Sequence, residues 1–384
     1  MLFGGCNCVS GSTLLPHLGT LCAGGAGFIS AMVAAMVANA QTGRARTIGR
    51  SVPEVDRLAV RIVTDNVIIQ FVPSEKRDGL TIERRSGSNT TPNTKPRTAL
   101  NAEWGLSMYA QSHRAGEERN VLVDFGYTPE VLLNNMAILG IDPSKFHALV
   151  LSHGHYDHFG GLVGFLAANK GALKNQLPFF VGGEDCFCLR RNPGGNYGAL
   201  DRKAIIEANL SLMFSEGPAL VADHAFTTGR IGQRSFETPL LPTQEIVGIF
   251  DGFGCFPEKM PAAKNTGDYI PDDFDHEIAT SYIVRGKGLV VLSSCSHRGV
   301  INAVRQAQEV SGIDKVHAVI GGFHIVPPLD DEYIRQTIAA FQEIDPDYLI
   351  PAHCSGDRFY ELARQAMGDK VIHSAVGTRF VFGD

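Results

Sequence analysis

The sequence predicts a layered α/β domain, and three observations lead to this prediction. Runs of β-branched and apolar residues come first in a group and later alternate with segments of helical spacing. Several of these apolar runs end directly at a histidine. The chain has 384 residues, of which 44% are hydrophobic and 19% are charged, so it is long enough to bury a sizeable core.

The N-terminal segment is predicted to be separate from this domain. Residues 18–40 contain no charged side chain, and Ala38-Asn39-Ala40 has the small-x-small pattern that signal peptidase accepts. We therefore expect residues 1–43 to be an export leader, which favours an exported or periplasmic protein over a cytoplasmic one. A Gly/Ala-rich arm and a membrane anchor are the alternatives. Membrane association is expected only if this segment is retained.

The elements of the domain follow in order along the chain. Residues 44–57 are expected to be a polar linker, and residues 58–384 to form the domain. The predicted strands of its first part are 58–72, 105–111, 120–126 and 147–153, and the predicted helices are 128–141, with Thr128 as N-cap, and 162–173. Residues 84–98 are predicted to be a loop, and the Gly/Pro-rich residues 174–276 an insert with short strands. Alternation then resumes with a hairpin (279–294), a helix (300–312), a strand (316–324), a helix (331–344) and a strand (348–353).

Charge and cysteine spacing exclude several kinds of protein. The net charge is −6 and there is no basic stripe, so a nucleic-acid partner is not expected. The eight cysteines show no paired CxxC spacing, so we expect neither a zinc ribbon nor a disulfide framework. Cys186 and Cys188 are predicted to be two thiols, with a metal pair as the alternative.

The predicted strand ends carry candidate metal ligands. Strand ends of an α/β sheet hold side chains rigidly toward one crevice. Imidazole together with carboxylate suits zinc, iron or manganese. The side chains after the 147–153 strand aim at two neighbouring points, which favours two ions close together. The candidates are His153, His155, Asp157 and His158 after that strand, and Cys295, His297, His324 and His353 after three others.

These residues carry a family resemblance. "HGHYDH" followed by "GGL" resembles the H-x-H-x-D-H signature of the metallo-β-lactamase superfamily. "GLVVLSSCSHRGVINAV", "HAVIGGFHI" and "DYLIPAHCSG" resemble the branch named for 7,8-dihydropterin-6-methyl-4-(β-D-ribofuranosyl)aminobenzene-5′-phosphate synthase. The similarity covers about residues 103–356. It implies an αββα sandwich with the metals at one edge, between two sheets.

The resemblance also implies roles for individual residues. One metal would be held by His153, His155 and His297, and the other by Asp157, His158 and His353. Asp124 would support the ligands, and Cys295 stands where other members of the family have a bridging aspartate. We expect Cys295 to be a small packed residue, with metal ligation as the alternative. Further candidates near the ions are Asp275, His276 and Glu277, and those for the substrate are His324 and Arg298, which would bind an anionic group.

The function expected from these residues is metal-dependent hydrolysis of a small molecule. Two divalent ions, zinc by preference and iron or manganese otherwise, would lower the pKa of a water between them. Asp157 would orient the resulting hydroxide toward a carbonyl or phosphoryl centre, in a substrate that could be pterin-related. The alternatives are a mono-iron dioxygenase or other oxidoreductase on the same fold, and a non-catalytic metal-binding protein.

Overall fold

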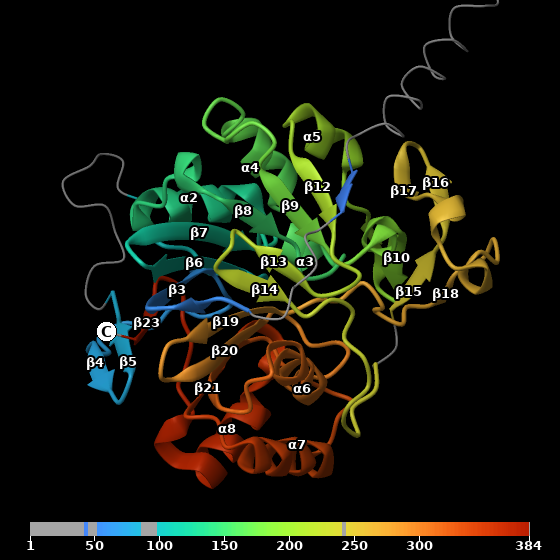
Figure 1. The fold of residues 1–384 in the computed structure, drawn as a ribbon. Coiled ribbons are helices and arrows are strands. Elements are labelled where there is room, and N and C mark those ends of the chain that lie inside the picture. The colour runs from blue at the N-terminus through green and yellow to red at the C-terminus, as the bar shows by residue number, and fades with distance from the viewer. Residues whose placement is uncertain (1–41, 45–51, 86–97, 240–242, 384) are drawn as a thin grey trace, which may run out of the picture. The chain divides into compact units, whose positions relative to one another are not determined.

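Two β-sheets pack face to face, and helices cover the outer face of each sheet (Figure 1). This computed structural model describes residues 42–44, 52–85, 98–239 and 243–383. The arrangement confirms the expected αββα sandwich. The predicted leader lies outside the described residues, apart from the few residues from 42 onward. Among the helices described, none has the length and apolarity needed to cross a bilayer.

The first sheet has ten strands and mixes parallel with antiparallel pairs. In spatial order they are β1 (Thr42–Arg44), β12 (Ser211–Phe214), β9 (Pro178–Val181), β8 (Ala148–Val150), β7 (Glu117–Val123), β6 (Ser107–Arg114), β3 (Arg57–Thr64), β23 (Arg379–Gly383), β5 (Leu80–Glu83) and β4 (Glu75–Arg77).

The second sheet has seven strands, and its C-terminal part is parallel. In order they are β13 (Ala219–Val221), β14 (Ala225–Thr227), β19 (Thr280–Val284), β20 (Gly288–Ser293), β21 (Val316–Gly321) and β22 (Tyr348–Pro351), with β2 (Glu54–Val55) beside β19. Because β2 pairs with β19 and β1 with β12, both ends of the predicted 44–57 linker border on sheet strands.

The structure describes seven α-helices, and local sequence explains where the first of them begins and ends. They are α2 (Pro129–Leu139), α3 (Tyr156–Phe159), α4 (Leu162–Ala168), α5 (Arg202–Glu207), α6 (Val300–Ser311), α7 (Asp331–Ile344) and α8 (Asp357–Met367). The predicted N-cap of α2 is confirmed, because the Thr128 hydroxyl accepts from the Val131 N–H at 3.4 Å. Gly140, at φ 68°, ends the same helix in the left-handed conformation that glycine adopts most readily. Short 3₁₀ turns are η1 (Pro143–Lys145), η2 (Glu184–Phe187), η3 (Pro257–Lys259), η4 (Ala262–Lys264), η5 (His353–Ser355) and η6 (Gly368–Lys370).

The core has three layers. Apolar side chains of both sheets, such as Val60, Val121 and Val290, fill the space between the sheets. A second cluster lies under α2 and α4, and a third under α6, α7 and α8. Central strands such as β8, β20 and β22 therefore have apolar residues on both faces.

The predicted strand over 58–72 is too long. β3 ends at Thr64, because the next two residues leave the sheet. The Asp65 carboxylate accepts from the His353 N–H, and the Asn66 side chain donates to the His353 carbonyl. The insert at 174–276 does not form a separate sheet throughout, since β9 and β12 join the first sheet and β13 and β14 the second. Its remaining strands form a small sheet of β11 (Gly195–Gly198), β10 (Leu189–Asn192), β15 (Gln244–Ile246) and β18 (Ile270–Pro271), and a hairpin of β16 (Gly248–Phe250) and β17 (Phe253–Cys255).

Candidate metal centre

The histidine cluster lies on the turn that follows β8. His153 and His158 are completely buried and His155 is 7% exposed. The short helix α3 begins after His155 and turns Asp157 and His158 back toward His153. The ring centroids of His153 and His158 are 4.2 Å apart, and those of His153 and His155 are 4.8 Å apart. The turn therefore concentrates its polar side chains at one end of the sandwich.

Asp124 fixes this turn from the neighbouring strand. It follows β7, and its carboxylate accepts from the Ser152 N–H and the Ser152 hydroxyl, both at 2.8 Å. Asp124 Oδ2, which accepts from the Ser152 hydroxyl, also lies 2.8 Å from His158 Nδ1. A proton on Nδ1 satisfies that contact, which leaves the lone pair of His158 Nε2 free. The supporting role predicted for Asp124 matches this position.

His297 and His353 reach the same place from the second sheet. His297 follows β20; its N–H donates to Glu277 at 2.9 Å, and its ring stacks on Phe274 at 4.1 Å. His353 follows β22, and its N–H donates to Asp65 at 2.9 Å. Both rings are thus held by contacts made away from the cluster.

The six predicted ligands fall into two groups of three. One donor atom from each of His153, His155 and His297 lies within 4.8 Å of the other two. Asp157, His158 and His353 satisfy the same condition. These are the two ligand sets that the family resemblance implies.

Several ring nitrogens in these groups are buried without a partner. They are the Nε2 atoms of His153, His155 and His158 and both ring nitrogens of His297. Burial lowers the pKa of His153 and His297 well below the ordinary value, and that of His155 to about 3. Neutral, unpartnered imidazole nitrogens are costly in a protein interior and are good metal ligands. The residues present therefore fit divalent metal ions.

The charge of Asp157 also favours a cation. Burial alone would raise the pKa of Asp157, but the neighbouring His158 and His353 hold it well below its ordinary value. His353 Nε2 lies 3.1 Å from Asp157 Oδ2. Burial alone would lower the pKa of His353, but Cys354 and Asp157 raise it to about 9. The carboxylate is thus ionised and surrounded by groups that stabilise its charge.

Cys295 lies among the ligands, and a second cysteine lies beside it. The Cys295 sulfur is within 4.8 Å of a donor atom from each of His153 and His158. It is 3.0 Å from the sulfur of Cys354, which the sequence analysis did not single out. Both cysteines are buried and neither is in a disulfide. Cys295 thus lies beside the candidate ligands, and its expected role as a small packed residue stays a prediction.

Other predicted site residues lie outside the two groups. His276 points into a buried ionic network, where its Nδ1 is 3.0 Å from Arg190 Nη2. Arg298 donates to the Asp273 carbonyl at 2.7 Å and lies 3.5 Å from an oxygen of Asp275. Glu277 accepts from the N–H groups of His297 and Arg298. These residues therefore hold the loops around the centre through contacts with other parts of the chain.

A cavity of about 600 Å³ opens onto the centre. His324 lies in its wall, with its ring 4.2 Å from that of His297, as a substrate-binding role requires. The rest of the lining was not predicted residue by residue: Trp104, Tyr127 and Thr243 lie in loops, Tyr156 begins α3, and Asn192, Asn196 and Tyr197 lie in β10 and β11. Aromatic and amide side chains therefore border the predicted ligands.

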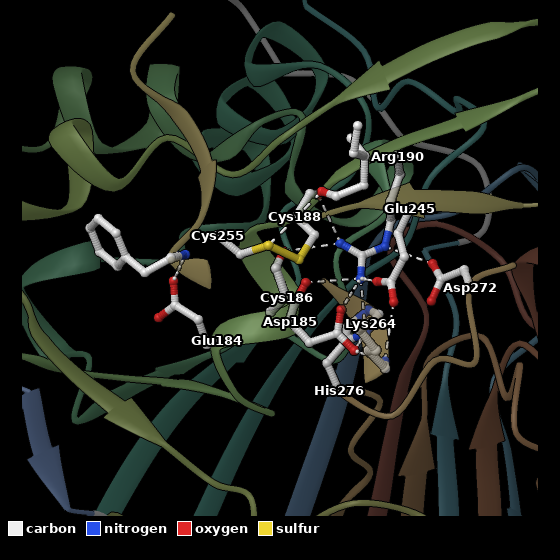
Figure 2. Close-up of a disulfide and its surroundings, with 12 residues drawn as sticks. Glu184, Asp185, Cys186, Cys188, Arg190, Glu245, Cys255, Lys264, Asp272 and His276 are labelled. Carbon is white, nitrogen blue, oxygen red and sulfur yellow. Dashed lines mark hydrogen bonds and ion pairs between the residues drawn. A yellow bond between two sulfur atoms is a disulfide. The ribbon is translucent and has the colours of Figure 1, made fainter. Parts of the chain in front are cut away.

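The insert is held by a disulfide and a buried ionic network (Figure 2). Cys188 is bonded to Cys255, so the prediction of two free thiols is wrong for Cys188 and holds for Cys186. The fully buried Arg190 lies 2.7 Å from Asp272 and 2.9 Å from Asp185. Asp272 Oδ2 is also 4.0 Å from His155 Nε2, so the network extends to the metal centre.

Comparison with known proteins agrees with this geometry. The family model described as the metallo-β-lactamase superfamily matches residues 108–173, which contain the histidine cluster and Asp124. In this segment and in its fold, the chain is similar to the metallo-β-lactamase superfamily. The chain is also 29% identical over 265 residues to the 7,8-dihydropterin-6-methyl-4-(β-D-ribofuranosyl)-aminobenzene-5′-phosphate synthase of Methanocaldococcus jannaschii, covering 66% of this chain and 82% of that protein.

Two further proteins are similar to the chain. An uncharacterized protein of Methanocaldococcus jannaschii is 26% identical over 263 residues, which cover 67% of this chain and 87% of that protein. Among solved structures, a metal-dependent hydrolase of the β-lactamase superfamily superposes with a TM-score of 0.59 at 20% identity, covering 84% of this chain and 98% of that one. This likeness shows that the metallo-β-lactamase fold is shared.

Proposed function

We propose that the chain is a metal-dependent hydrolase of a small molecule. The observation that carries the proposal is that six donors form two groups of three, and that buried imidazole nitrogens of His153, His155, His297 and His158 have no hydrogen-bond partner. His153, His155 and His297 would hold one ion, and Asp157, His158 and His353 the other. Zinc suits this mixture of imidazole and carboxylate, and iron or manganese would also fit. The chemistry supplied by such ions is Lewis acidity, which acidifies water and polarises a carbonyl or phosphoryl group.

The side chains around the centre have separate tasks in this proposal. Asp157 lines the cavity as an ionised carboxylate, so it can accept a hydrogen bond from the attacking water and orient it. Asp124 keeps His158 in one tautomer. His324 faces the cavity and is placed to donate to the substrate. Arg298 would bind a substrate anion only after leaving Asp273 and Asp275.

The cavity lining supports a flat, partly apolar substrate. Trp104, Tyr127 and Tyr156 are each more than a third exposed and border the cavity, where they offer ring faces for stacking. Asn192 and Asn196 offer amide donors and acceptors for the edge of a ring. Together with the similarity to the dihydropterin synthase, this lining favours a second candidate, transfer of a pterin-like group at the same centre.

Metal analysis combined with an activity screen tests the proposal. The full chain is expected to contain two equivalents of metal and to hydrolyse a member of a panel of lactones, phosphomonoesters and phosphodiesters. Asp157→Asn is expected to lose this activity, while Asp142→Asn, on an exposed turn, keeps it. One equivalent of iron with oxygen consumption would instead support the dioxygenase. Bound metal without turnover of any substrate would support a non-catalytic metal-binding protein. Turnover of a dihydropterin together with an arylamine would support the transferase.

A further inference from the structure

Two cysteine sulfurs meet in the wall of the cavity. The Sγ atoms of Cys295 and Cys354 are 3.0 Å apart, about 1 Å more than a disulfide bond. Each residue is only 2% exposed, yet both line the cavity of about 600 Å³. Small polar solutes in the cavity can therefore reach them.

The backbone is built to bring these sulfurs together. Cys295 follows β20 and Cys354 follows β22, and each of these strands pairs with β21 rather than with the other. Strands separated by one neighbour lie about 10 Å apart. The sulfurs meet only because both turns bend over the end of β21. A Cβ placed on Gly322 there would lie 2.6 Å from the Cys354 sulfur, so this position needs glycine.

Hydroxyl groups hold the two turns in place. The Ser296 hydroxyl donates to the Gly322 carbonyl at 2.7 Å. The Ser355 hydroxyl accepts from the Phe323 N–H at 3.1 Å. Each serine is next to one of the two cysteines and contacts the chain just after β21. The distance between the sulfurs is thus fixed by hydrogen bonds on both sides.

We propose that Cys295 and Cys354 form an oxidisable dithiol that hydroperoxides convert to an intramolecular disulfide. In the first step one thiol attacks hydrogen peroxide; the O–O bond breaks, the sulfur becomes a sulfenic acid, and water leaves (an alkyl hydroperoxide would release an alcohol instead). In the second step the other thiol attacks that sulfur, the S–O bond breaks, the S–S bond forms, and a second water leaves. The two thiols together lose two protons and two electrons, and hydrogen peroxide is reduced to two waters.

Disulfide formation has a consequence for the metal centre. Cys295 Sγ lies within 4.8 Å of donor atoms of His153 and His158, and Cys354 directly follows His353. Drawing the sulfurs together would move groups that border both ligand sets. Oxidation is therefore expected to lower the metal content. This consequence rests on the proposed function, whereas the disulfide itself does not.

Peptide mapping of the full chain tests the proposal. The protein is reduced with dithiothreitol, desalted, treated with hydrogen peroxide and digested without reduction. We expect a cross-linked pair of peptides that contains Cys295 and Cys354, is lighter by two hydrogens than their sum, and separates again in dithiothreitol. Wild-type protein in which both cysteines stay unmodified, or become sulfinic acids without a cross-link, would overturn the proposal.

Matched variants and a metal assay complete the test. Cys186→Ser is the control, because Cys186 is buried and does not line the cavity, and it should cross-link like the wild type. Cys354→Ser should lose the cross-link, and any oxidation at Cys295 should stop at sulfur acids. Metal content is measured on the same samples. A cross-link with unchanged metal content would support the proposed dithiol and count against the assigned metal ligands. The two proposals can therefore be contradicted independently of each other.

Discussion

The Nδ1 atom of His158 lies 2.8 Å from Oδ2 of Asp124, and neither side chain is exposed to solvent. This pair connects β7 with the turn after β8 and directs the other ring nitrogen of His158 toward the centre. Asp124 also holds Ser152, whose hydroxyl is 3.0 Å from His153 Nδ1. One carboxylate thus orients two predicted ligands.

Asp124→Asn is expected to weaken metal binding by about 10–100-fold, as is typical of residues that orient metal-bound histidines. The amide cannot accept at both positions, so His158 loses its fixed tautomer. Competition with a chromogenic chelator measures the affinity. Asp142→Asn, on an exposed turn, is the control and should bind metal like the wild type. Equal affinities for the two variants would contradict the role of Asp124.

The double substitution of His153 and His155 by alanine is expected to abolish metal binding and leave the fold largely intact. Both residues lie on a turn after a buried strand; their Nε2 atoms have no hydrogen-bond partner, and His153 Nδ1 contacts the hydroxyl of the adjacent Ser152. Elemental analysis gives the metal content and far-ultraviolet circular dichroism the fold. His113→Ala, which removes a half-exposed histidine of β6, is the control. Wild-type metal content in the double variant would exclude this site.

Loss of the Cys188–Cys255 disulfide is expected to destabilise the protein by about 2–4 kcal/mol, because the bond closes a loop with a sequence separation of 67 residues. Thermal unfolding of Cys188→Ser/Cys255→Ser against the wild type measures this. The double variant should also unfold at the same temperature with and without dithiothreitol. A Tm equal to that of the wild type would show that the bond does not form in the native protein.

Arg190→Met is expected to cost about 3–5 kcal/mol, since it leaves the buried carboxylate of Asp272 without the guanidinium 2.7 Å away, while Lys264 still pairs with Asp185 and Glu245. Burial alone would lower the pKa of Arg190, but Asp272, Asp185 and Glu245 raise it, so the guanidinium is charged. Urea unfolding measures the change. Arg191→Met is the matched control, because Arg191 lies over the Tyr269 ring at the surface and should cost about 1 kcal/mol or less. Similar losses in both variants would show that the network is not stabilising.

Glu237 is expected to make stability depend on pH. Burial raises its pKa to about 7, although the N–H groups of Ile301 and Asn302, at the start of α6, donate to it. The folded carboxyl group therefore keeps its proton where the unfolded one has lost it. Its contribution to stability is complete below about pH 4.5 and is lost as the pH rises to about 7.

Glu237→Gln removes this titration. Between about pH 5 and pH 8, the wild type should lose on the order of 1–3 kcal/mol of unfolding free energy relative to the variant. Chemical denaturation at both pH values measures the difference. Glu258→Gln, at an exposed position, should follow the wild type at both. If Glu237→Gln does so as well, the carboxyl group is ionised throughout this range.

Local chemistry explains what could be predicted from the sequence. A run of buried apolar residues that ends in histidines defines both a strand and the side chains at its end, so β8 and the 153–158 turn could be located without coordinates. The hairpin of β19 and β20 is likewise a local feature, set by two buried runs on either side of a Gly-Lys-Gly turn.

Long-range packing explains what could not be predicted. Cys188 and Cys255 are 67 residues apart in a segment without periodicity, so no local signal pairs them. His276 could have been a ligand by its position before β19, but Arg190 and Asp185, more than 80 residues earlier, draw it into their network. Cys354 directly follows a predicted ligand, and only the bend over Gly322 shows that it meets Cys295.

The predicted ligands come from both halves of the chain: His153, His155, Asp157 and His158 follow a strand of the first sheet, while His297 and His353 follow strands of the second. A metal ion bound by ligands from both sheets would cross-link the two sheets at this end of the sandwich. By mass action, ligand binding to the native state alone raises stability by about 2.7 kcal/mol at a hundredfold excess over Kd. Binding of metal should therefore make the two sheets unfold together in one cooperative transition. Removal of metal should loosen the sandwich first at the end that carries the predicted ligands.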